Sequence, residues 1–114
     1  MRNRIRYTDT VQCNDFYRLP TFLFSDQFKT LSANAKVLYM LLMDRLIELS
    51  EKNGWPNDKN EDYIIMPREE MCKLVGVSMK TVIKVVNELI KFGLLEEKPG
   101  KQGKPNQIYL LAPE

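Results

Sequence analysis

The feature that most constrains this 114-residue chain is a glycine-centred corner between two short helical patterns, followed by a lysine-bearing hairpin. Helical patterns over residues 68–74 and 79–92 meet at Gly76, which can adopt the positive φ of a tight corner. Strand patterns over residues 94–98 and 107–111 then enclose a loop with two lysines, two glycines and two prolines. This order predicts a winged helix-turn-helix: an α+β fold, mainly helical, with a small antiparallel sheet and a β-hairpin wing. Such modules mostly hold double-stranded DNA.

The length and the charge pattern fit one small domain with its positive charge near this motif. With 114 residues the chain can form a single core, so we expect a flexible basic arm over residues 1–14 and one winged-helix domain over residues 15–114. Residues 78–107 carry six lysines against three glutamates, whereas residues 44–70 carry eight acidic and four basic residues. This distribution favours nucleic acid as a partner of the motif, although only weakly on charge alone.

The segments before the motif are expected to build the core. Ser32 predicts the N-cap of a long helix from Ala33 to about Ser50, and Ile47 is expected to widen its leucine stripe. The polar residues 53–62 predict a loop or a hairpin, and residues 63–66 predict a short strand.

An aromatic cluster precedes the long helix, and a short helical turn is expected near Ser25 to Lys29. The cluster consists of Phe16, Tyr17, Phe22, Phe24 and Phe28. We interpret these side chains as a cap over the core, because a small domain needs its large apolar side chains inside. A dimer contact is the alternative interpretation.

The second helix of the motif, residues 79–92, has two distinct faces. One face is apolar and carries Val82, Val85, Val86 and Leu89. The opposite face spans about 60° and is polar; it carries Lys80, Lys84, Asn87 and Lys91. A helix with such a face fits the major groove, where guanine edges suit lysine and adenine edges suit asparagine. An ordinary solvated helix face is the alternative, and the adjoining corner and hairpin outweigh it.

These positions give a candidate DNA-binding surface. Lys80, Lys84 and Asn87 are the candidates for base reading. Ser78 and Thr81 carry hydroxyl groups beside a helix N-terminus, which suits phosphate oxygens. Lys91 lies further along the helix, where a phosphate contact or plain solvent is expected.

The hairpin loop adds Lys101, Gln102 and Lys104 as candidates for a phosphate or minor-groove contact. The alternative is a flexible, solubilising loop. The arginines of the arm, Arg2, Arg4 and Arg6, could follow a minor groove or form a loose tail.

Several classes of function have no support in the sequence. The chain contains no histidine, no glycine-rich phosphate motif and no converging carboxylate pair, so we expect a non-enzyme without catalytic residues, metal or cofactor. Cys13 and Cys72 are expected to be reduced thiols, with Cys72 turned inward beside Met71 and Leu74. No segment is apolar enough to span a membrane, and we expect a cytoplasmic protein.

Beyond these patterns, the chain resembles the N-terminal domain of the RepA-type (RepA_N) replication initiators of low-copy plasmids in Gram-positive bacteria. The resemblance covers residues 16–111, nearly the whole chain. Its most specific pieces are the approach from Tyr17 to Pro20, the helix segment AKVLYMLLMDR, the NGW turn and the wing segment GKPNQIYLL.

The resemblance implies a winged-helix domain that recognises direct repeats (iterons) in double-stranded DNA at a plasmid origin. It also implies a homodimer and a further C-terminal domain that engages host replication proteins. The reading helix maps onto residues 79–92 and the wing onto residues 99–106. Such wings often carry a basic residue where this chain has Gln107, and Glu96 and Glu97 precede the wing, so a weakened wing contact is expected.

Two other functions use the same layout. A transcription regulator would use the same groove contacts at an operator. A winged helix for protein contact in replication assembly would instead present the aromatic segment, residues 16–28, as a docking patch.

Overall fold

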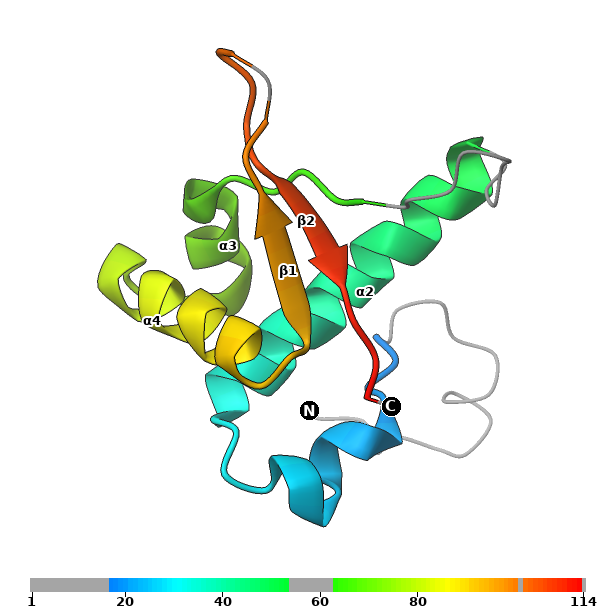
Figure 1. Cartoon of the computed structure of the whole chain (residues 1–114), viewed down its shortest axis with the longest axis vertical. Helices are drawn as coiled ribbons and strands as arrows, with labels where there is room; N and C mark the ends of the chain where they lie inside the picture. Colours follow the sequence, from blue (N-terminus) through cyan, green and yellow to red (C-terminus); the bar gives the residue numbers. More distant parts are fainter. Residues whose placement is uncertain (1–16, 54–62, 101, 114) are drawn as a thin grey trace, which may run out of the picture.

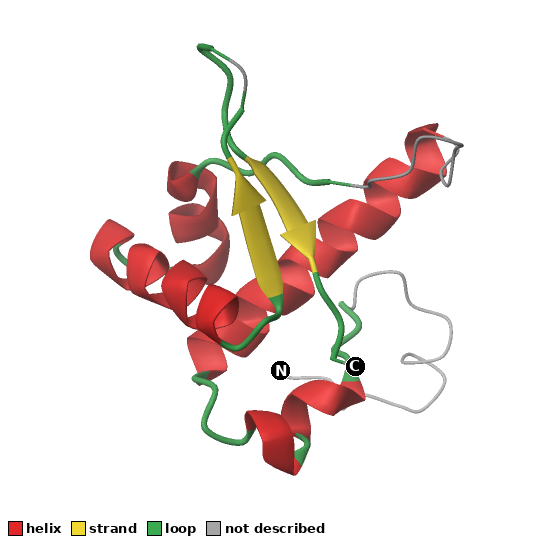
Figure 2. Ribbon diagram, in the orientation of Figure 1, coloured by secondary structure: helices red, strands yellow, loops and turns green. Residues whose placement is uncertain are grey.

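The structure is a computed structural model that describes residues 17–53, 63–100 and 102–113. Its elements are η1 (Thr21–Phe24), η2 (Asp26–Phe28), α2 (Ala33–Asn53), α3 (Arg68–Val75), α4 (Met79–Lys91), β1 (Leu95–Lys98) and β2 (Gln107–Leu110). In Figure 1 the two strands lie in front of α2, with α3 and α4 beside them and the β1–β2 loop extending beyond the sheet. Figure 2 shows how helices dominate this arrangement. The predicted α+β winged-helix fold is confirmed.

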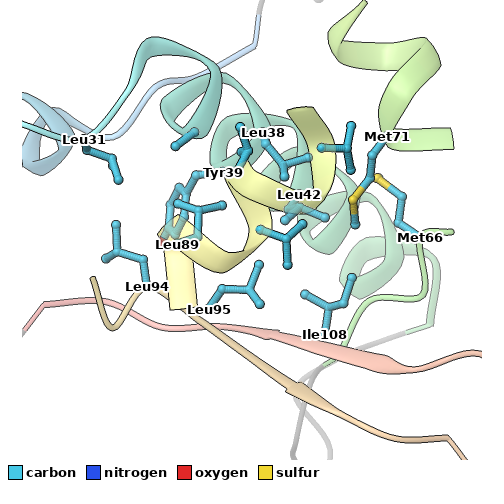
Figure 3. Packing of buried hydrophobic residues seen from close by; sticks show 14 of the residues in the cluster. Leu31, Leu38, Tyr39, Leu42, Met66, Met71, Leu89, Leu94, Leu95 and Ile108 are labelled. Carbon is cyan, nitrogen blue, oxygen red and sulfur yellow. The ribbon is translucent and has the colours of Figure 1, made fainter. Parts of the chain in front are cut away.

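One apolar core joins α2, α4 and the inner face of the sheet (Figure 3). Each of these elements contributes residues with almost no exposed surface, and no polar or charged side chain of the described residues is buried among them. The largest fully buried side chains include Tyr39, Phe28, Leu38, Leu42, Ile64, Met71, Leu89, Leu94, Leu95 and Ile108. The hydrophobic effect therefore holds α2, α4 and the two strands in one fixed arrangement.

Helix α2 begins as the sequence predicts and ends slightly later. The Ala35 amide donates to Ser32 Oγ over 3.1 Å, which confirms Ser32 as the cap. The helix continues to Asn53 rather than ending near Ser50. The prediction for Ile47 was wrong, because this side chain is exposed on the last turns of α2, which extend past the sheet (Figure 1).

The aromatic segment forms two short 3-10 helices, and only part of it caps the core. Phe22 packs against Phe28 and Tyr39, with ring centroids 5.8 Å and 5.7 Å apart. Tyr17 and Phe24, in contrast, are exposed. Phe16, the arm over residues 1–14 and Cys13 lie outside the described residues.

The corner between α3 and α4 has the predicted left-handed glycine. Gly76 has a φ of 82°, and its amide donates to the Cys72 carbonyl over 2.8 Å. Met71 is buried and Cys72 is half-buried. Leu74 was wrongly predicted to point inward: it is 43% exposed, because the inward side of this short helix is centred on Met71, Cys72 and Val75.

The sheet contains two strands in antiparallel register, with Leu95 opposite Leu110. Their bounds agree with the predicted strands to within one residue at each end. The strand predicted over residues 63–66 was wrong in extent, since only Ile64 pairs, exchanging two backbone hydrogen bonds of 2.8 and 2.9 Å with Ile108. Pro67 and the start of α3 turn the chain away from the sheet directly afterwards. Residues 54–62 of the predicted polar loop lie outside the described residues.

Candidate nucleic-acid interface

Both ends of α4 are fixed by interactions that its sequence provides. At the start, the Thr81 amide donates to Ser78 Oγ over 3.3 Å, so Ser78 caps the helix. At the end, Gly93 has a φ of 74°, and the Leu94 amide donates to the Leu89 carbonyl over 3.0 Å. The helix is therefore held at both termini before any partner binds.

The two predicted faces of α4 are confirmed. The apolar residues Val82, Val85, Val86 and Leu89 are buried in the core. The polar residues Lys80, Lys84, Asn87 and Lys91 are all exposed. The structure thus brings the four predicted contact residues of this helix together on one outward side.

This outward side is not neutralised by local ion pairs. Glu88, the acidic neighbour of Lys84, instead accepts hydrogen bonds from the amide and the hydroxyl of Ser32, each of 2.7 Å. Within the described part of the chain, neither Lys80 nor Lys84 forms an ion pair. Two ammonium groups are therefore available to an external anion.

Ser78 and Thr81 lie together at the N-terminus of α4. Their hydroxyl groups are 3.1 Å apart and share one hydrogen bond. Because two hydroxyl hydrogens are present and this bond uses one, a hydroxyl hydrogen remains to donate to a phosphate oxygen. The positive end of the helix dipole favours an anion at the same place.

The wing projects from the sheet beyond α3 (Figure 1). Gln102 and Lys104 are exposed near its tip, and Lys101 lies outside the described residues. The two sides of the hairpin loop run so close together at Gly100 that a side chain would not fit there. A Cβ on Gly100 would lie 2.1 Å from the Pro105 carbonyl oxygen. The polar side chains of the wing are thus exposed on a loop whose two arms lie close together.

The acidic residues that precede the wing are compensated by cations. Arg68 donates to both carboxylate oxygens of Glu97, over 2.9 and 2.7 Å. Glu96 lies 3.9 Å from the ammonium group of Lys98. The two glutamates should therefore repel a phosphate group near the wing less than their charge alone suggests. The Arg68–Glu97 pair also connects β1, the strand before the wing, to α3.

A second ion pair holds the first turn of α3 from the other side. Arg45 of α2 hydrogen-bonds to Glu70, and this bond raises the pKa of the Arg45 guanidinium above its ordinary value. Arg68 and Glu70 therefore connect one helical turn to both the wing and the long helix. No sequence signal indicates these pairs, because their members lie 29 and 25 residues apart.

The sequence interpretation missed exposed apolar residues on α4. Met79 and Ile83 lie on its accessible surface beside the lysines. Their four-residue spacing, outside the stripe of buried valines, was the signal that could have revealed them.

In the described ranges no helix is both long and apolar enough to cross a membrane. The same residues contain no group of three or more histidine, cysteine, aspartate or glutamate side chains placed to hold a metal ion.

Comparison with known proteins agrees with this geometry. Residues 15–113 match the family model RepA_N, described as "Replication initiator protein A (RepA) N-terminus". The chain belongs to this family. A relative in Lactobacillus helveticus, described as "41 kDa protein", is 29% identical over 117 residues, which is 96% of this chain and 33% of that protein. This RepA_N chain thus spans about a third of the curated relative's length.

Three solved structures share the fold of this RepA_N chain. One described as "N-Terminal domain of DNA binding protein" has a TM-score of 0.75 at 28% identity, covering 100% of this chain and 86% of that one. "Structure of Rep-DNA complex" gives a TM-score of 0.74 at 28% identity, with coverages of 98% and 85%. "Structure of MDR initiator" gives 0.71 at 30% identity, with coverages of 98% and 88%.

Proposed function

We propose that this chain is the duplex DNA-binding domain of a plasmid replication initiator and that it recognises direct repeats at the origin. In this proposal α4 enters the major groove and the wing lies along the flanking backbone. The observation that carries the proposal is the outward side of α4, whose lysines have no ion-pair partner among the described residues. Unpaired ammonium groups on a rigidly held helix favour binding to a phosphate-rich duplex.

The roles of the individual residues follow from their positions. Lys80, Lys84 and Asn87 face the bases, where lysine suits guanine and asparagine suits adenine. Ser78 and Thr81 hold a phosphate at the helix N-terminus. Lys91, further along α4, and the wing residues Lys101, Gln102 and Lys104 contact the backbone. Membership of the RepA_N family and the likeness to a Rep–DNA complex support these assignments.

We further propose that two copies pair when the domain binds repeated sites. The exposed aromatic segment supports this proposal, because Phe24 is 62% exposed, and Tyr17 and Leu19 of the same segment are also exposed. Large apolar side chains left accessible in this way mark contact surfaces. Sedimentation of wild-type protein and Phe24→Ser would test it: we expect a weaker dimer in the variant, and an unchanged monomer–dimer equilibrium would contradict this surface.

The remaining parts of the proposal concern the whole initiator. Host replication proteins would be engaged through a region C-terminal to this domain, and the domain itself would act by binding rather than by catalysis. A plasmid initiator works where the plasmid is, which places the protein in the cytoplasm.

The test is a salt titration of duplex binding by fluorescence anisotropy. The duplexes are a random sequence and repeat-containing DNA from within or near the protein's own gene. We expect the logarithm of the affinity to fall steeply with the logarithm of the salt concentration. In Lys80→Ala/Lys84→Ala, each lost base contact should cost about 1–3 kcal/mol of binding free energy.

A matched control is Lys29→Ala/Lys52→Ala, which removes the same charge from exposed positions outside α4. This variant should bind the repeats almost as well as wild type. Equal losses in both double variants would contradict a role for α4. Tight binding to an operator-like site rather than to the repeats would favour a transcription regulator, and weak, salt-insensitive binding to every duplex would favour a protein-contact module.

A further inference from the structure

An apolar side of α4 lies next to its lysines and is not used by the core. Met79, Ile83 and Ile90 are exposed, and Ile83 is the most accessible of the three, with 48% of its surface exposed. At 100° per residue these three positions fall within about 40° of one another. A single exposed isoleucine needs no explanation, but an aligned set on a reading helix calls for a contact.

Ile83 lies at the edge of the polar face, and along the helix axis it falls between the proposed base-reading residues Lys80 and Asn87. Lys80 precedes it by three positions and Asn87 follows it by four, so both are its direct neighbours on the helix surface. Lys80 and Asn87 are also exposed. Any groove surface that receives Lys80 and Asn87 must therefore also lie against Ile83.

The major groove offers one apolar group to such a side chain. Thymine presents its C5-methyl group there, and the other edges present hydrogen-bond donors and acceptors. We propose that Ile83 is a specificity-determining residue that contacts the methyl group of a thymine in the recognised site. This inference rests on the proposed DNA-binding function and adds a preference that lysine and asparagine contacts do not provide.

Ile83 is better placed for this contact than Ile90. Ile90 follows Ile83 by seven positions, so it lies about 10 Å further along the helix axis, towards its C-terminal end. In helix-turn-helix proteins the N-terminal residues of the reading helix reach the base edges. An isoleucine in a helix also holds one χ1 rotamer strongly, so its methyl groups are already positioned before binding.

The experiment uses the chain as it is and a duplex selected with it from a randomised library. Each thymine of the selected site is replaced in turn by uracil, which removes only the methyl group. We expect one such change to weaken wild-type binding about fourfold, the factor for one buried methyl-sized group. Ile83→Ala should bind the thymine and uracil duplexes with equal affinity.

Ile90→Ala is the matched control, and it should keep the preference of the wild type for thymine. The inference is overturned if uracil has no effect at any position in the wild type, or if the selected site contains no thymine. It is also overturned if Ile83→Ala retains the loss or Ile90→Ala abolishes it. The uracil scan of the wild type needs no variant, so a scan without any effect overturns the inference even if Ile83→Ala does not fold. If Ile83→Ala does not fold, Ile83→Val replaces it and should reduce the loss caused by uracil; an unchanged loss would overturn the inference. If wild type binds no duplex at any salt concentration, the proposed function itself fails and the inference fails with it.

Discussion

At the scale of single residues, the contact between Ser32 and Glu88 serves two helices at once. Ser32 caps α2, and its amide and hydroxyl also donate to the Glu88 carboxylate of α4. The start of α2 and the C-terminal half of α4 are thereby connected. A charged acceptor strengthens both bonds.

Loss of this contact should therefore destabilise the fold. We expect Ser32→Ala and Glu88→Gln each to lower the free energy of unfolding by about 1–2 kcal/mol, since the first removes a cap and the second a charged acceptor. Urea denaturation measures both effects. The double variant should lose less than the sum of the two, because both substitutions act on the bond between the Ser32 hydroxyl and the Glu88 carboxylate.

Ser50→Ala is the control, as the Ser50 hydroxyl donates to the nearby Ile47 carbonyl on the same helix and has no other partner in the described part of the chain. A change of less than about 0.5 kcal/mol is expected there. Strict additivity of Ser32→Ala and Glu88→Gln would show that the bond between the Ser32 hydroxyl and the Glu88 carboxylate contributes nothing to stability.

Residue-scale contacts were also the part that the sequence predicted least. Helical periodicity correctly separated the valines of α4 from its lysines, because it depends only on local geometry. The partner of Glu88 lies 56 residues away, and such a pairing depends on how complete helices pack. The same limit explains why the exposure of Leu74 and Ile47 was predicted wrongly.

At the scale of elements, an ion pair connects β1, the strand before the wing, to α3. Glu97 accepts two hydrogen bonds from Arg68, whereas its neighbour Glu96 is exposed and points to the other face of the strand. The side-chain exposure differs accordingly, at 17% for Glu97 and 51% for Glu96. The two glutamates therefore make a matched pair for a test.

We expect Glu97→Gln to lower the free energy of unfolding by about 0.5–1 kcal/mol, a range reduced for the partial exposure of the pair. Glu96→Gln should be neutral within error. Thermal or urea denaturation at low salt would measure the difference, which should shrink as salt screens the pair. Equal effects of the two substitutions would exclude a specific role for the Arg68–Glu97 link.

The elements themselves were largely predictable. The glycine corner, the cap of α4 and both strands appear in the structure close to their predicted bounds, because each is encoded by local backbone preferences. The strand expected over residues 63–66 is the exception. Its apolar residues could have continued a ladder, but Pro67 and the start of α3 limit the pairing to Ile64.

At the scale of the whole molecule, Tyr39 connects the first half of α2 to the segment that follows β2. Its hydroxyl donates to the Leu111 carbonyl over 3.0 Å, and burial raises the pKa of Tyr39 above the ordinary value of 10.0. The neutral form is therefore preferred in the folded state. Its contribution to stability is fully present below pH 10 and is lost as the pH rises through the raised pKa.

Tyr39→Phe should thus cost about 1 kcal/mol near neutral pH, the value of one buried hydrogen bond. The difference in unfolding free energy between wild type and variant should shrink above pH 10. Urea denaturation across pH 7 to about 11.5 would measure this difference, with Tyr17→Phe at an exposed position as the control for alkaline effects elsewhere. A difference that stays constant above pH 10 would contradict the assigned titration.

The valines on the inner side of α4 have a consequence for how this domain can change its target. β-branched side chains have almost one rotamer in a helix, so Val82, Val85 and Val86 leave little room for the helix to rotate about its axis. An exposed residue of α4 can then be substituted while the other exposed side chains of the helix keep their orientation. Under the proposed function, we expect relatives with the same buried side of α4 and different exposed residues to recognise different DNA sites.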